Sequence, residues 1–131
     1  MSTVTSPSPT SPEDVIRRFE RLLGAGDVDG LLELYEPAAA FRTQAGLVTG
    51  HDAIRGALKE LVALKPVISG DIQRVVEADG TALLINRWVL DGTAPDGSAV
   101  QMSGVSADIM RRRPDGSWRV LVDDPWGATA I

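Results

Sequence analysis

The chain contains no cysteine and only one histidine among its 131 residues. Without thiols it can form neither a disulfide framework nor a thiolate metal site. A single imidazole also argues against a zinc site built from protein ligands. We therefore expect no metal site built from the protein's own side chains.

The chain also has few basic residues and no long apolar run, which bears on whether it binds nucleic acid or a membrane. Basic residues number 13 against 18 acidic ones, and the resulting net charge of −5 argues against nucleic acid or an anionic membrane as partner. No apolar run approaches the roughly 18 residues that a membrane span requires. The N-terminus lacks the charged start and apolar centre of a secretory signal. The composition predicts a cytoplasmic protein that binds neither nucleic acid nor membrane.

The chain contains enough apolar residues to form one hydrophobic core. Hydrophobic residues make up 44% of the chain and charged residues 24%, which is ordinary for a globular domain. The first residues are rich in Ser, Thr and Pro and nearly free of apolar side chains, so burial cannot offset their ordering entropy. We predict a disordered tail over residues 1–11 and a single domain over residues 12–131.

The first half of this domain has the apolar periodicity of helices. Pro12 follows the N-cap residue Ser11 at the start of the first helix, which ends at a Gly-Ala-Gly sequence. The second helix is short, carries Tyr35 on its buried face and ends near Pro37. A third helix is predicted over residues 50–64, and two short strands, over 38–43 and 46–49, precede it.

Everything after Pro66 has the pattern of an antiparallel sheet. Three turn signals, one Ala-Asp-Gly and two Pro-Asp-Gly, separate apolar or alternating segments. The expected strands cover residues 67–77, 82–90, 99–110 and 117–123. Helices at the start and strands at the end predict an α+β fold, with the helices on one face of a curved sheet.

Asp108 stands out in the third of these strands. Side chains alternate across a strand, so Asp108 shares one face with Gly104, Ser106 and Met110. An acid among small and apolar neighbours must be hydrogen-bonded, paired with a cation, or raised in pKa by desolvation. Two interpretations stay open: an acid inside a cavity, or a structural carboxylate satisfied by a hydroxyl or by an arginine such as Arg87.

Three segments together resemble the nuclear transport factor 2-like superfamily, especially its SnoaL-like and ketosteroid-isomerase-like branch. They are FERLLGAGDVDGLLELYEPAAAF, TGHDAIRGAL and DIMRRRPDGSWRV. The resemblance implies a cone, in which a curved antiparallel or mixed sheet wraps around three helices and encloses an apolar cavity. Members include isomerases, polyketide cyclases, dehydratases, epoxide hydrolases and noncatalytic modules, and the fold does not choose among them.

The resemblance can be carried to single residues. In ketosteroid isomerases a protonated Asp in this strand donates a hydrogen bond to the developing enolate, and Asp108 aligns with it. Phe19 and Thr43 replace the catalytic Tyr and the general-base Asp, which argues against ketosteroid isomerisation. The epoxide-hydrolase branch needs an Arg two residues from the Asp, where this chain has Ser106 and Met110.

A second carboxylate, Asp123, follows in the last strand. If this hairpin pairs as the family does, Leu121 and Asp123 point into the cone with Asp108, and Asp124 points out. Two carboxylates in one apolar cavity push their pKa values apart, which supplies an acid and a base. In the alternative interpretation, Asp123 and Asp124 end an edge strand and bond to a turn.

We expect the ligand to be an apolar small molecule bound inside the cone. Large aromatic faces bind flat apolar ligands well, although ordinary core packing would use the same residues. Besides the two carboxylates, the predicted ligand-binding residues are Phe19, Tyr35, Phe41, Thr43, Trp88, Ser106, Met110, Leu121 and Trp126.

Two functions follow from this set. The first is a cofactor-independent cyclase, isomerase or dehydratase, in which Asp108 is the acid and Asp123 the base acting on a carbonyl-bearing substrate. The second is a noncatalytic ligand-binding or homodimeric assembly module of the same fold. Apolar residues on the outer face of the sheet, Val105, Ala107 and Ile109, predict a homodimer through that face.

Overall fold

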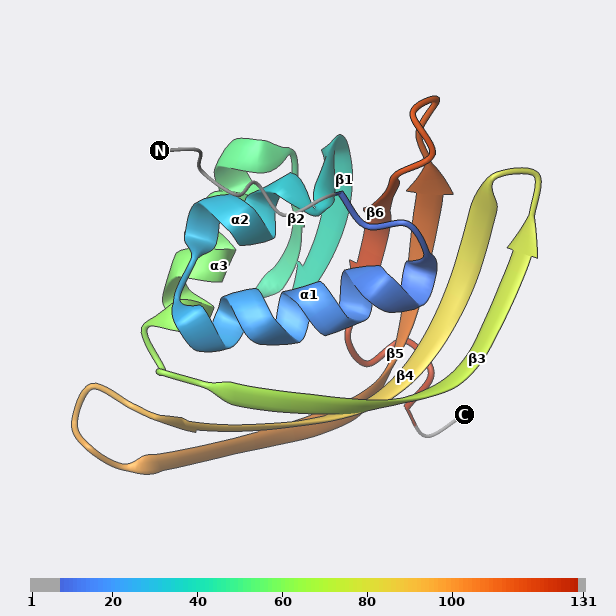
Figure 1. Cartoon of the computed structure of the whole chain (residues 1–131). Coiled ribbons are helices and arrows are strands. Elements are labelled where there is room, and N and C mark those ends of the chain that lie inside the picture. Colours follow the sequence, from blue (N-terminus) through green and yellow to red (C-terminus); the bar gives the residue numbers. More distant parts are fainter. Residues whose placement is uncertain (1–7, 130–131) are drawn as a thin grey trace, which may run out of the picture.

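The computed structural model describes residues 8–129 and has the predicted α+β architecture (Figure 1). Three helices lie against a curved six-stranded sheet that does not close into a barrel. In chain order the elements are α1 (Pro12–Ala25), α2 (Val28–Glu33), β1 (Tyr35–Thr43), β2 (Gly46–Thr49), α3 (His51–Val62), β3 (Val67–Ala78), β4 (Thr81–Thr93), β5 (Ala99–Arg112) and β6 (Trp118–Asp124).

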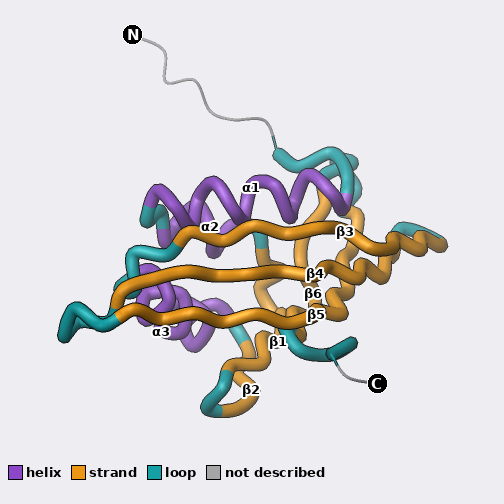
Figure 2. The backbone as a smooth tube through the Cα atoms, turned by 90° about the horizontal axis from the view of Figure 1, so that it is seen from below, coloured by secondary structure: helices purple, strands orange, loops and turns teal. Residues whose placement is uncertain are grey.

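The sheet is mixed, with the strand order β2-β1-β6-β5-β4-β3. Strand β1 runs parallel to β6, and every other neighbouring pair is antiparallel. Figure 2 shows the long strands β3, β4 and β5 side by side, with the helices on one side of them. Their curvature gives the sheet a concave face, and the helices fill part of it.

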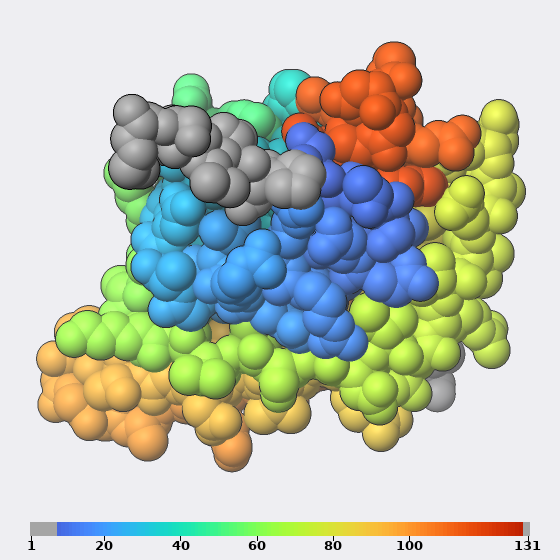
Figure 3. Space-filling model, in the orientation of Figure 1, coloured from blue at the N-terminus to red at the C-terminus, as the bar shows by residue number. Residues whose placement is uncertain are grey.

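Helix α1 begins and ends where the sequence predicts. The Ser11 hydroxyl accepts a hydrogen bond from the Asp14 amide at 3.1 Å, and Gly26 ends the helix in the left-handed conformation with φ of 70°. Val15 and Leu23 on the inner side of the helix are buried. In Figure 3 the atoms of α1, in blue, lie in the middle of the view, with those of β3, in yellow-green, below them. Capping and an apolar stripe therefore place α1 across the cone.

The predicted tail ends earlier than expected. Pro9 is buried, and its carbonyl accepts a hydrogen bond of 3.0 Å from the Trp118 amide at the start of β6. The prediction of disorder is therefore wrong for the segment that contains Pro9. Residues 1–7 lie outside the described part of the chain.

Tyr35 lies on a strand, so its predicted place on the second helix is wrong. Helix α2 ends at Glu33, and the Leu34 carbonyl already accepts a hydrogen bond of 2.7 Å from the Val120 amide of β6. The residue before a proline avoids the helical conformation, which favours extended backbone just before Pro37. Strand β1 therefore starts at Tyr35, with its side chain buried against β6.

The last hairpin contains an irregularity that alternation alone does not predict. Asp108 pairs with Asp123, whereas Met110 pairs with Val120, so Leu121 is the extra residue of a β-bulge. The bulge places Val120 and Asp123 on the cavity wall and leaves Leu121 off it. The prediction that Leu121 faces the cavity is therefore wrong, and Val120 takes its place.

No helix in the described part of the chain is long and apolar enough to cross a lipid bilayer.

Candidate functional site

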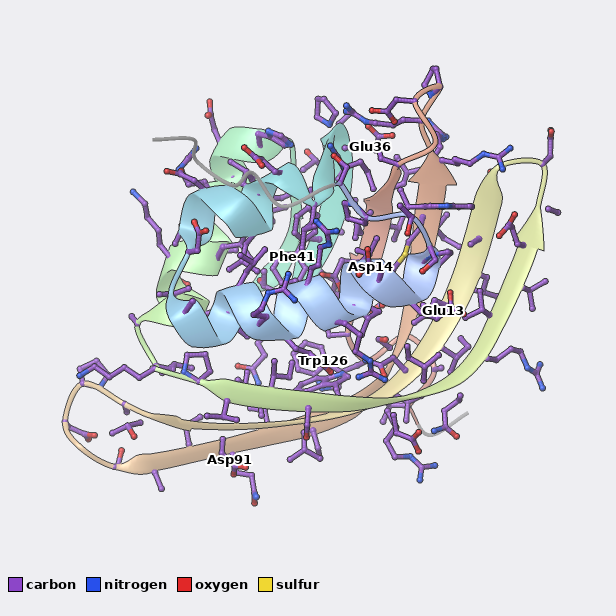
Figure 4. The ribbon with its side chains drawn as sticks, in the orientation of Figure 1. Glu13, Asp14, Glu36, Phe41, Asp91 and Trp126 are labelled. Carbon is purple, nitrogen blue, oxygen red and sulfur yellow. The ribbon has the colours of Figure 1, made fainter. Side chains whose placement is uncertain are left out.

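A cavity of about 340 Å³ lies between the helices and the concave face of the sheet. Figure 4 shows Phe41 and Trp126 in this space, while Asp91 projects from the other side of the sheet. The cavity is lined mainly by apolar side chains. Its size falls at the small end of the range of small-molecule clefts. The predicted site residues that line it are Phe19, Tyr35, Phe41, Thr43, Trp88, Ser106, Asp108, Asp123 and Trp126.

Besides Leu121, one predicted residue is absent from the cavity wall: Met110, which is completely buried. It lies on the inner face of β5, as alternation predicts, and packs into the hydrophobic core. Its prediction as a ligand contact is therefore wrong, because neighbouring core residues cover it.

Asp108 and Asp123 stand opposite each other on β5 and β6, and both line the cavity. Asp108 is only 5% exposed. The Ser106 hydroxyl donates to its Oδ2 at 3.0 Å, and the Asp124 amide lies 3.3 Å from its Oδ1. The two carboxyl groups belong to paired residues of β5 and β6, and the negative charge of Asp123 raises the pKa of Asp108. They form one unit, which we call the carboxyl pair.

Tyr35 is the third member of this cluster. Its hydroxyl donates to Oδ2 of Asp123 at 2.6 Å. Burial, and next the charge of Asp123, raise the pKa of the Tyr35 hydroxyl well above its ordinary value. Tyr35 therefore remains a neutral donor that stabilises negative charge on Asp123.

Burial raises the pKa of both members of the carboxyl pair, but their surroundings differ. The pKa of Asp108 is raised well above its ordinary value, first by burial and then by the charge of Asp123. Burial also raises the pKa of Asp123, but hydrogen bonds from Tyr35 and Asp108 oppose that rise. The charged form is thus better supported on Asp123 than on Asp108.

No arginine pairs with Asp108 in the described residues. Arg87 is exposed, and β4 turns its side chain away from the inner face that carries Asn86 and Trp88. The interpretation of Asp108 as the partner of such a cation is therefore wrong. The other expected partner, a hydroxyl group, is present, because Ser106 donates a hydrogen bond to Asp108.

Trp88 and Trp126 form an aromatic corner of the cavity. Their rings meet edge to face with centroids 5.7 Å apart. The Trp88 indole donates to the Pro125 carbonyl at 2.7 Å, and the Trp126 indole donates to the Ser103 carbonyl at 3.2 Å. Both polar edges are therefore satisfied by the protein, which leaves apolar ring surface for a ligand.

Phe19 and Thr43 add no acid or base to the wall. Phe19 is apolar, and the Thr43 hydroxyl is engaged in the β1–β2 turn, where it donates to the Gly46 carbonyl at 2.9 Å. In the part of the chain that the structure describes, no three His, Cys, Asp or Glu side chains cluster so as to hold a metal ion. Asp108, Asp123 and Tyr35 therefore form the main polar cluster of the cavity.

Among the polar cavity residues that the sequence analysis did not predict, Asn86 is the most buried. Asn86 faces inward from β4 and is 6% exposed. An Asn that interrupts an apolar strand at an inward position was the available signal. The residues that surround the Asn86 side chain depend on the strand register, which the sequence pattern alone does not give.

Comparisons with known proteins agree with this geometry. The family model described as a SnoaL-like domain matches residues 16–121. No curated protein matches the chain significantly in sequence.

Several solved structures share the fold. A nuclear transport factor 2-like superfamily protein from Salmonella enterica serovar Typhimurium is 16% identical with a TM-score of 0.77, over 89% of this chain and 90% of that one. Aln2 from a Streptomyces species is 21% identical with a TM-score of 0.71, over 88% and 91%. A conserved protein from Planctomyces limnophilus is 19% identical with a TM-score of 0.77, over 85% and 88%.

Proposed function

Because the chain belongs to the SnoaL-like domain family, we propose that its cavity binds a small apolar ketone or aldehyde and catalyses acid–base chemistry on it without a cofactor. The observation that carries this proposal is the pairing of Asp108 with Asp123 across β5 and β6, where both residues line an apolar cavity. Paired carboxyl groups in unequal surroundings are a recurring way to obtain an acid and a base at neutral pH.

The protonation state follows from the contacts. Two adjacent buried carboxylates cannot both ionise without strong repulsion, so the carboxyl pair retains one proton. Tyr35 donates to Asp123, which favours the ionised form of that residue. Asp108 is then the acid, and Asp123 is the base.

These states define the first step. Asp123 accepts the proton from the carbon next to the substrate carbonyl, and the electrons of that C–H bond move toward the carbonyl oxygen. Asp108 donates a hydrogen bond to this oxygen as negative charge develops on it. Returning the proton from Asp123 to another carbon gives isomerisation. Attack of the enolate on a second carbonyl, whose oxygen then takes this proton, gives cyclisation. Loss of a β-hydroxyl, which takes the proton and leaves as water, gives dehydration.

The charges around the cavity favour a neutral substrate. Glu20 and Glu60 line it together with the single negative charge of the carboxyl pair, while Arg42 is the one cation among the lining residues. Arg42 lies 3.9 Å from Asp124 and is more than half exposed. A carboxylate or phosphate ligand would therefore meet net repulsion.

The chemistry can be tested by deuterium exchange. A panel of bicyclic ketones is incubated with the protein in D₂O, and incorporation next to the carbonyl is followed by mass spectrometry. We expect the unaltered protein to accelerate exchange for at least one ketone. Asp123→Asn should abolish this acceleration because it removes the base, and Asp108→Asn should reduce it by about 10²–10⁴-fold.

Asp124→Asn is the matched control. It removes a carboxylate from the same strand, but one that does not line the cavity. Exchange should persist in this variant. Equal exchange in the Asp123→Asn variant and the unaltered protein would contradict the proposed catalysis.

A noncatalytic ligand-binding role is the second candidate. It is favoured by Phe19 and Thr43, which stand in the cavity where the resembling isomerases have a Tyr and an Asp. Binding of the ketones in calorimetry without any acceleration of exchange would select this role.

We also propose that two copies of the chain associate through the outer face of the sheet. Large apolar side chains are exposed there on β3 and β4, among them Val76, Leu83 and Val89. Their exposure is unfavourable in a monomer and is removed when a second sheet covers them.

A further inference from the structure

We infer that the Asn86 side chain is a second polar anchor of the cavity, and that the ligand carries a hydroxyl group in addition to its carbonyl. The inference rests on the proposed function, because it names a further group on the substrate of the same site. The observations that carry it are the burial of Asn86, its unpartnered amide oxygen and its position relative to the carboxyl pair.

The Asn86 amide is buried without full hydrogen bonding. The residue is 6% exposed, and its Oδ1 has no hydrogen-bond partner in the described part of the chain. Ser106, directly opposite on β5, does not relieve it, because its hydroxyl is directed to Asp108 and to the backbone carbonyl of Asn86. A buried polar atom left unpaired costs free energy that a ligand hydrogen bond would recover.

The fold makes room for this amide. A Cβ on Gly70 of β3 would lie only 2.7 Å from both the Oδ1 and the Nδ2 of Asn86. The missing side chain of Gly70 therefore provides the space in which the amide lies. Arg17 of α1 donates to the Gly70 carbonyl at 3.1 Å, which ties this part of β3 to the helix above it. The amide is thus supported before any ligand arrives.

The sheet register sets the separation between the two polar positions. Asn86 of β4 pairs with Ser106 of β5, and Asp108 is the next inward-facing residue of β5. Diagonal neighbours of this kind are about 7–8 Å apart. A compact ring system can span that separation and contact both positions. The ligand would then have one oxygen at the carboxyl pair and another at Asn86.

The chemistry of the amide selects a hydroxyl as the second group. A side-chain amide offers both a donor and an acceptor, and a hydroxyl can use both, whereas a ketone can use only the donor. The negative charge of the carboxyl pair disfavours an anion at this distance. The ligand class is therefore a neutral hydroxylated carbonyl compound of two or three rings.

Two naphthols provide the test. Their phenolic oxygen stands in for the enolate oxygen of the reaction, and binding is measured by calorimetry with 2-naphthol and with naphthalene-2,6-diol. We expect the unaltered protein to bind the diol about tenfold more tightly, the value of one added hydrogen bond. Asn86→Leu, which keeps the approximate shape without the amide, should remove this preference for the diol.

A second variant tests the supported position of the amide. Gly70→Ala retains Asn86 but places a methyl group in its space. It should also reduce the preference for the diol, and thermal melts show whether each variant is folded.

The outcomes separate the two proposals. Equal affinity of the unaltered protein for the two naphthols would overturn the role of Asn86 and leave the carboxyl-pair function standing. Failure of both to bind would overturn both. Because this comparison uses the unaltered protein, it remains decisive even if a variant does not fold.

Discussion

At the scale of single residues, the environment of Asp108 determines how it affects stability. The unfolded chain ionises this carboxyl at an ordinary pKa, whereas the native cavity raises its pKa. Between these two pKa values the native state holds a proton that the unfolded state has lost. The contribution of Asp108 is therefore fully present in acid and is lost as the pH rises toward the native pKa.

The first prediction concerns Asp108→Asn. Above pH 4, each pH unit should lower the free energy of unfolding of the unaltered protein by about 1.4 kcal/mol relative to that of the variant. At neutral pH the variant should be as stable as the unaltered protein, or more stable, because the amide needs no proton. Thermal and denaturant melts across this range measure the difference. A clearly less stable variant at neutral pH would indicate an ionised, structurally paired Asp108.

At the scale of elements, much of the fold could be predicted from the chain alone. Ser11 and Gly26 define α1, the Pro-Asp-Gly turns define the hairpins, and alternation places Asp108 on the inner face of β5. These signals are local, so they could be found without the tertiary structure.

The failures come from interactions between distant segments. Tyr35 joins a strand because β6 pairs with it, and Leu121 leaves the cavity wall because a bulge forms against β5. The importance of Asn86 depends on the space above Gly70, which belongs to another strand. Each of these outcomes required the strand register, which is a property of the whole sheet.

The second prediction concerns the close contact between β5 and the segment after β6. A Cβ on Gly104 would lie 2.6 Å from Cδ1 of Trp126 and 3.1 Å from the Pro125 carbonyl oxygen. Gly104→Ala should therefore displace Trp126 from the aromatic corner and destabilise the protein by about 1–3 kcal/mol. Thermal melts and tryptophan fluorescence measure the two effects.

Gly56→Ala is the control for this substitution. Gly56 lies inside α3 with open space where its Cβ would be, so alanine should stabilise the protein by about 0.4–1 kcal/mol. If Gly104→Ala were equally harmless, the packing of Trp126 against β5 would be looser than described.

At the scale of the whole molecule, the two faces of the curved sheet differ in character. The concave face holds the cavity, while the outer face exposes Val76 by 52%, Leu83 by 36% and Val89 by 40%. Val105 and Ile109, which also indicated this face, are half-buried within the chain. The exposed apolar area therefore centres on β3 and β4.

The third prediction is a homodimer through this face. Sedimentation at micromolar concentration should give twice the chain mass of 13.9 kDa. Leu83→Lys should shift the equilibrium toward the monomer because it places a charge in the apolar contact, whereas Glu77→Lys, a charge change at an exposed polar position of β3, serves as the comparison. A single-chain mass for the unaltered protein would contradict the dimer.

We propose that Asp108 and Asp123 share one proton, with Asp108 as the acid. Carbon NMR of the side-chain carboxyl groups, followed across a pH titration, measures which carboxyl holds it. We expect the Asp108 carboxyl to be still protonated at neutral pH while Asp123 is ionised, and Tyr35→Phe to raise the pKa of Asp123 by removing its hydrogen bond. Ordinary titration of both carboxyl groups near pH 4, independent of each other, would contradict it.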